Sequence, residues 1–126
     1  MSSPIDDGTI HDEDWLLRRI HPQQVVMDSN KGYYRPSSAA FRDPELSVDA
    51  EPFLHSQGLD WKFCILKYPT YSLVRFMAKA ARELQLPVVP DPLPDNTSHA
   101  LVLGKKTKGK ANKLRDSSSW VQCLPP

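Results

Sequence analysis

Six basic side chains lie close together near the C-terminal end of the sequence. Residues 105–115 contain no acidic residue, and their basic residues are Lys105, Lys106, Lys108, Lys110, Lys113 and Arg115. Such a cluster can neutralise the phosphates of a nucleic acid or of a smaller ligand, with binding that weakens as salt rises. The cluster contains no aromatic residue, so base stacking would need Tyr33 and Tyr34 to face the same way. A solvated helix face is the alternative explanation of these charges.

A second set of polar residues lies beside apolar segments and could form a cleft. It consists of Arg18, Arg19, Ser37, Ser38, Ser47 and His99, of which Arg18, Ser37, Ser38 and His99 are the candidates for an enzymatic cleft. Arginine and hydroxyl groups bind phosphate or carboxylate through charge-assisted hydrogen bonds, and histidine can act as a general acid or base near neutral pH. Two serines after a proline are equally typical of a turn or cap. Catalysis by this set would require the four side chains to converge on one point.

Part of this set loosely resembles the nucleotide-binding strands of ADP-ribosyltransferases. The resemblance rests on Leu16-Leu17-Arg18 and on Pro36-Ser37-Ser38-Ala39-Ala40-Phe41, in that order along the chain. It implies a nucleotide-handling enzyme with Arg18, Ser37, Ser38 and His99 around one cleft. The late-strand glutamate of many such enzymes has no counterpart, because no glutamate follows Glu83.

Composition excludes several classes of protein. The chain has 126 residues, 16 Lys plus Arg against 15 Asp plus Glu, and 25% charged residues, which argues against a coiled coil and a strongly charged disordered chain. No apolar run approaches the roughly 20 residues of a membrane helix, and the acidic residues after Met1 are unlike a secretory signal. Two cysteines without a CxxC, and histidines without HExxH spacing, predict no disulfide framework, no metal and no cofactor. We therefore expect a cytoplasmic protein.

The pattern of apolar residues predicts an α+β fold, with a small mixed or mostly antiparallel sheet. Val25–Met27 and Tyr33–Tyr34 flank turn residues and predict a hairpin. We expect further strands at 46–48, 61–68 and 98–104 and an extended segment at 87–90. Apolar residues spaced by three and four predict the principal helix at 71–84. Short helices are expected at 49–55, with Asp49 as its N-cap, and at 107–115.

Charge and composition also predict how the chain is divided. Residues 1–15 carry five acids and no Lys or Arg, so residues 1–12 are expected to form a disordered acidic tail. We expect a single domain over 13–122 and a short C-terminal tail over 123–126. The acidic end could fold back on the basic segment, in which case it would compete with a polyanion.

Several segments resemble those of short bacterial proteins of unassigned function. They are Leu17-Arg18-Arg19-Ile20-His21-Pro22, Pro36-Ser37-Ser38-Ala39-Ala40-Phe41, Leu46-Ser47-Val48, Asp91-Pro92 and His99-Ala100-Leu101-Val102-Leu103-Gly104. The resemblance covers about residues 15–121 and implies a compact prokaryotic cytosolic domain. It implies no particular activity.

The sequence therefore favours a small binding or accessory protein over a self-sufficient enzyme. Its expected ligand is a phosphate-bearing molecule or nucleic acid bound by residues 105–115, and a protein partner or a homodimer is the next possibility. One alternative is the nucleotide-handling enzyme described above. Another is a structural subunit of an operon-encoded complex, which predicts an apolar patch near Trp15 and Trp120.

Overall fold

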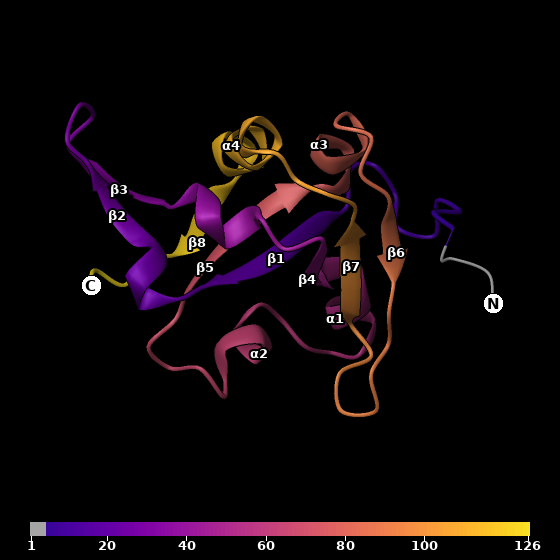
Figure 1. Ribbon diagram of the computed structural model, residues 1–126. Helices are drawn as coiled ribbons and strands as arrows, with labels where there is room; N and C mark the ends of the chain where they lie inside the picture. Colours follow the sequence, from indigo (N-terminus) through magenta and orange to yellow (C-terminus); the bar gives the residue numbers. More distant parts are fainter. Residues whose placement is uncertain (1–4) are drawn as a thin grey trace.

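The computed structural model describes residues 5–126, which form an antiparallel sheet of six strands with short helices on both faces (Figure 1). The strands of this sheet are Trp15–Ile20 (β1), Glu45–Ala50 (β4), Ser72–Met77 (β5), Val88–Pro90 (β6), His99–Leu103 (β7) and Ser119–Gln122 (β8). They lie in the order β6-β7-β4-β1-β5-β8. The predicted α+β class and antiparallel sheet are confirmed.

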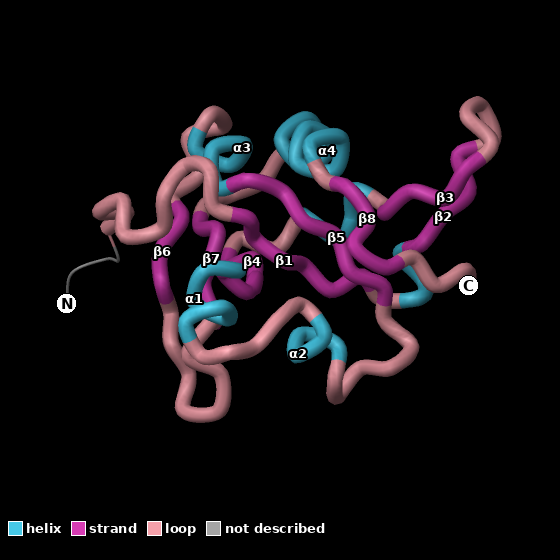
Figure 2. Tube along the Cα trace, turned by 180° about the vertical axis from the view of Figure 1, so that it is seen from behind, coloured by secondary structure: helices cyan, strands magenta, loops and turns pink. Residues whose placement is uncertain are grey.

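Helices lie on both faces of the sheet (Figure 2). An apolar layer of side chains covers each face. The helices are Glu51–Ser56 (α1), Lys62–Ile65 (α2), Ala78–Arg82 (α3) and Lys108–Ser117 (α4), with 3-10 turns at Pro22–Gln24 (η1) and Ser38–Phe41 (η2). The larger layer lies beneath α3, α4 and η2 and includes Leu16 and Phe76. The smaller layer lies beneath α1 and α2 and includes Leu17 and Cys64. Adjacent residues of β1 thus point to opposite faces, as the alternation of a strand requires.

The predicted hairpin forms a separate two-stranded sheet of Val25–Asp28 (β2) and Tyr33–Pro36 (β3), which projects beside α4 and β8 (Figure 1). The Asp28 carboxylate accepts hydrogen bonds from the backbone N–H groups of Asn30 and Lys31, at 3.0 and 3.2 Å. Gly32 has a φ of +74°, a conformation that glycine adopts without strain. These turn residues fix the register of the hairpin.

The strand predicted over 61–68 is wrong, because this segment contains the short helix α2. The Asp60 carboxylate accepts a hydrogen bond from the backbone N–H of Lys62, at 2.9 Å, and starts the turn. Trp61, Phe63 and Ile65 pack against the smaller apolar layer. The run is therefore apolar because it covers one face of the sheet, not because it lies within the sheet.

The principal helix predicted over 71–84 is also wrong, since its first half is strand β5 and only Ala78–Arg82 is helical. Leu73 belongs to the smaller apolar layer, whereas Val74 and Phe76 belong to the larger one. A strand that is apolar on both faces supplies apolar residues at helical spacings as well. The longest helix described in residues 5–126 is α4, which confirms the helix expected near 107–115.

The helix expected after Asp49 is present as α1, but Asp49 does not cap it. The N-cap residue is Ala50, which makes no side-chain hydrogen bond to the helix. Asp49 lies in β4, opposite Leu17 of β1, and only 4% of its surface is exposed. Its carboxylate is therefore carried into the interior by the sheet.

The acidic N-terminal region packs against α3 over its described part. Ile10 is fully buried, and Arg82 donates two hydrogen bonds of 2.8 Å to the Asp6 carboxylate. Arg82 also donates to Asp12, at 2.8 Å. Asp6, Ile10 and Asp12 therefore contact α3, residues 1–4 lie outside the described residues, and the disordered tail stays a prediction. Among the described acids of this region, Asp6 and Asp12 pair with Arg82, and none forms an ion pair with the basic segment. The domain limits at 13–122 and 123–126 stay a prediction.

No helix among residues 5–126 combines the length and apolar character needed to cross a membrane.

The Asp6–Arg82 pair gives a stability prediction. Arg82 holds the pKa of Asp6 below its ordinary value of 3.8, so the carboxylate stabilises the fold above that pH and loses its effect as pH falls. We expect Asp6→Asn to lower the free energy of unfolding by about 1–2 kcal/mol at neutral pH. The difference should shrink below about pH 4, as measured by urea unfolding.

Asp7→Asn is the matched control, because Asp7 is exposed and its carboxylate bonds only to Thr9. Equal effects of the two substitutions would contradict a specific Asp6–Arg82 contact.

Candidate functional site

The basic segment begins just before α4 and continues along it. The Thr107 hydroxyl caps the helix by accepting a hydrogen bond from the N–H of Lys110, at 3.2 Å. Ala111 and Leu114 are fully buried on the inner face. The basic side chains therefore fall outside that face, where Lys105, Lys108 and Lys113 are exposed and Lys110 and Arg115 are half-buried.

Lys106 differs from its neighbours, because only 2% of its surface is exposed. Its ammonium Nζ donates to the backbone carbonyls of Val102 and Gly104, at 2.7 and 2.8 Å. Burial lowers the pKa of Lys106 to about 8. Lys106 thus fastens the end of β7 to the start of α4. Its inclusion among the polyanion-binding candidates is corrected, because the ammonium is turned inward.

A cleft of about 420 Å³ lies between the hairpin and the C-terminal end of α4. Its lining includes Tyr33, Tyr34 and Arg35 of the hairpin, Arg115 of α4 and Trp120 of β8. The Trp120 indole N–H donates to the carbonyl of Tyr34, at 3.0 Å, and so joins β8 to the hairpin. The Tyr33 side chain is more open, with 54% of the residue exposed. The aromatic residues of the hairpin therefore do share one cleft with the last residue of the basic segment.

Two carboxylates reduce the positive charge of this cleft. Arg115 Nη2 lies 2.9 Å from Asp116 Oδ1, and Arg35 Nε lies 3.7 Å from Asp28 Oδ2. The exposed lysines of the basic segment are different, since no carboxylate of residues 5–126 lies within 4.0 Å of their ammonium groups. Helix α4 therefore carries unpaired positive charge at Lys108 and Lys113, and Arg115 at its C-terminal end lines the aromatic cleft, whereas Lys113 lines a depression on the side of Glu83.

The four residues of the proposed enzymatic cleft do not converge. Arg18 points to the α4 face, where it donates to the carbonyls of Ala40 and Ser47, each at 3.1 Å. On the same face, the Ser37 hydroxyl accepts a hydrogen bond from the N–H of Ala39 and caps η2, which Ser38 begins. His99 lies on the opposite face of the sheet, since it is paired in register with Asp49. The arrangement implied by the resemblance to ADP-ribosyltransferases is therefore absent.

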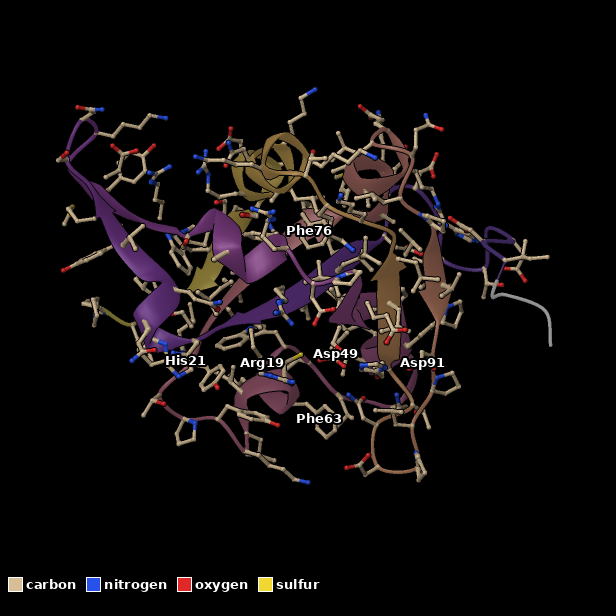
Figure 3. All side chains as sticks on the ribbon, viewed as in Figure 1. Arg19, His21, Asp49, Phe63, Phe76 and Asp91 are labelled. Atoms are coloured by element: carbon tan, nitrogen blue, oxygen red, sulfur yellow. The ribbon has the colours of Figure 1, made fainter. Side chains whose placement is uncertain are left out.

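The face that carries His99 has a cavity of its own, of about 220 Å³. Its polar lining includes Arg19, Ser47, Asp49, Asn96 and His99. Figure 3 shows Arg19 and Asp49 between the sheet and α2, whereas Phe76 lies toward α4. Arg19, Ser47 and His99 belong to the polar set predicted from the sequence, whereas Asp49 was predicted to cap a helix. Side chains alternate along a strand, so Arg19 lies on the same face of β1 as Leu17, toward the smaller apolar layer.

Cys64 beside this cavity is a structural thiol. It is buried in the smaller apolar layer, as expected of a small hydrophobe, and both cysteines are free. Burial, reinforced by the Asp49 carboxylate, raises the pKa of Cys64. The thiol therefore stays protonated and is a poor nucleophile.

The two tryptophans that could have formed an apolar partner surface are both half-buried. The Arg75 guanidinium covers the ring of Trp15, with its carbon 4.2 Å from the ring centroid. Trp120 packs against the larger apolar layer. A partner patch built on these indoles is thus weakly supported.

Comparison with protein-family models, with curated proteins and with solved structures finds no match to this chain.

The buried Lys106 predicts a particular dependence of stability on pH. Its pKa is about 8 in the folded protein and near the ordinary 10.5 when unfolded, so folding releases a proton between these values. The stability of the natural protein relative to Lys106→Met should therefore rise from pH 7 to pH 10, by roughly 1–3 kcal/mol. Denaturant unfolding of both proteins measures this difference, and a constant difference across the range would contradict the buried ammonium.

Proposed function

We propose that this protein binds phosphate-bearing ligands, and specifically single-stranded nucleic acid, along α4 and the cleft beside the hairpin. The observation that carries the proposal is the shared lining of that cleft by Tyr33, Tyr34 and Arg115. Proteins that bind single strands without sequence preference combine a basic groove for the backbone with aromatic rings for the bases. Here the two components come from segments far apart in the sequence.

The exposure and charge of the basic and aromatic residues assign them different roles in binding. Lys108 and Lys113 are exposed and would contact phosphates without first breaking an ion pair. Arg115, on the same helix, lines the cleft, where the exposed ring of Tyr33 offers a face for stacking. A single strand suits this cleft better than a duplex, because its unpaired bases can turn toward the aromatic residues.

The charge component is tested by Lys108→Ser/Lys113→Ser. Fluorescence anisotropy with a labelled oligothymidylate, repeated over a range of salt, should show a steep negative salt slope for the natural protein. Two lost phosphate contacts should reduce the slope by about 1.4 on the scale for single strands. Affinity at low salt should fall several-fold.

Lys62→Ser/Lys67→Ser removes the same charge from exposed positions near α2, across the sheet from α4. This control should leave the titration unchanged. Equal weakening by both pairs would show that only net charge matters and would overturn the proposed surface.

The stacking component is tested by Tyr33→Ala. Loss of one stacked base corresponds to roughly 1–3 kcal/mol, so affinity should fall by about fivefold or more while the salt slope stays the same. Because Tyr33 is exposed, the melting temperature should not change. Unaltered affinity would remove the hairpin from the binding surface.

A further inference from the structure

The cavity on the α2 face contains a buried carboxylate with few partners. Asp49 accepts a hydrogen bond from Asn96 Nδ2, at 2.7 Å, and its other polar side-chain neighbour is the Cys64 thiol. The amide of Asn96 is held in this orientation because its Oδ1 accepts the backbone N–H of Ser98, at 3.1 Å. A carboxylate can accept about four hydrogen bonds, and a charge buried without a cation is unfavourable. Asp49 is therefore suited to a cationic group that enters the cavity.

His99 supplies a second acceptor beside Asp49. Its Nδ1 lies 3.0 Å from the backbone oxygen of Asp91 and 3.0 Å from Asp91 Oδ2. A ring nitrogen between two acceptors must carry the proton, so in the neutral imidazole Nε2 has the free lone pair. Asp91 lies on the β6 side of His99, and Asp49 of β4 is paired with His99 on the other side (Figure 3). Asp91 is thus a positioning residue that sets the tautomer of His99.

Arg19 supplies the opposite charge on the neighbouring strand. Its guanidinium carbon lies 4.2 Å from the centroid of the Tyr68 ring, and its Nη1 donates to the carbonyl of Cys64, at 3.3 Å. These contacts hold the guanidinium in place and leave other N–H groups available to a ligand. A planar guanidinium can donate two parallel hydrogen bonds to a carboxylate. Because Leu17 is opposite Asp49, Arg19 is the diagonal neighbour of Asp49 on the same face.

The charges of the cavity balance. Arg19 and Lys67 carry positive charge, and Asp49 and Asp95 carry negative charge. The apolar part of the lining is formed by Phe63, Leu66 and Leu93. A ligand that carries a cation and an anion a few ångströms apart, with a small apolar group, complements this pattern better than a polyanion would.

We propose that this cavity binds a free α-amino acid with an apolar side chain. The ammonium group lies against Asp49 and the Nε2 of His99, the carboxylate lies against Arg19, and the side chain lies against Phe63. The volume of about 220 Å³ suits a molecule of this size. The site lies on the opposite face of the sheet from α4 and does not depend on the nucleic-acid proposal.

The first test uses the natural protein and three probes: leucine, leucinamide and N-acetyl-leucine. Isothermal titration calorimetry should give leucine a Kd of about 1 mM or tighter. Each modified probe lacks one charge and should bind at least about tenfold more weakly. Tighter binding of ribose 5-phosphate than of leucine, or equal binding of the three probes, would overturn the proposal.

Two variants then assign each charge to its partner. Arg19→Gln should remove the preference for leucine over leucinamide, whereas Asp49→Asn should remove the preference for leucine over N-acetyl-leucine. Asp49→Asn should also keep or raise the melting temperature, because it removes a buried charge that forms no ion pair among residues 5–126. Lys62→Ser, outside the cavity, is the control. Unchanged preferences in both variants would contradict the proposed contacts, even if the natural protein binds leucine.

Discussion

The central strand β1 is the constraint on which the rest of the molecule depends. It lies between β4 and β5 in the middle of the sheet, and apolar layers cover both of its faces. Leu16 and Leu17 are both almost fully buried, but in different layers. Any shift of β1 by one residue would exchange the two faces along its whole length. The register of β1 therefore decides which polar side chains can meet.

The adjacent arginines of β1 illustrate the consequence. Arg18 points toward α4 and donates to the carbonyls of Ala40 and Ser47, which ties η2 and β4 together. Arg19 points the other way and lines the cavity beneath α2. Identical side chains in consecutive positions thus serve different purposes: Arg18 donates hydrogen bonds to carbonyls of η2 and β4, and Arg19 offers a positive charge to a cavity. The sheet separates two candidate sites of different chemistry.

Local signals in the sequence were sufficient for some elements. The turn chemistry of Asp28 to Gly32 predicts the hairpin, and Thr107 predicts the start of α4, because a short-range hydrogen bond decides each. Segment 61–68 was predicted as a strand and contains helix α2, and segment 71–84 was predicted as a helix and begins with strand β5. The spacing of apolar residues in each segment fits either element, and only the position of the segment relative to the sheet decides between them. A helix predicted in place of a strand leaves the fold class unchanged, but it puts individual residues in the wrong positions.

The candidate sites depended more strongly on tertiary placement. The basic segment was recognised from composition, yet composition could not show that Lys106 turns inward to two carbonyls. The polar cavity was missed because Arg19, Asp49 and His99 come from three strands, and their shared face follows only from the pairing of β1, β4 and β7. Residues that act together through sheet register are separated in the sequence by whole elements, and no local pattern joins them.

The most direct test of the central claim, that nucleic acid binds on the α4 face of the sheet, is a map of backbone amide shifts during titration with an oligothymidylate. The account predicts shifts concentrated in the hairpin from Tyr33 to Arg35 and along α4 to Trp120, with the segment around α2 unchanged. Shifts concentrated instead around Arg19, Lys67 and His99 would contradict it.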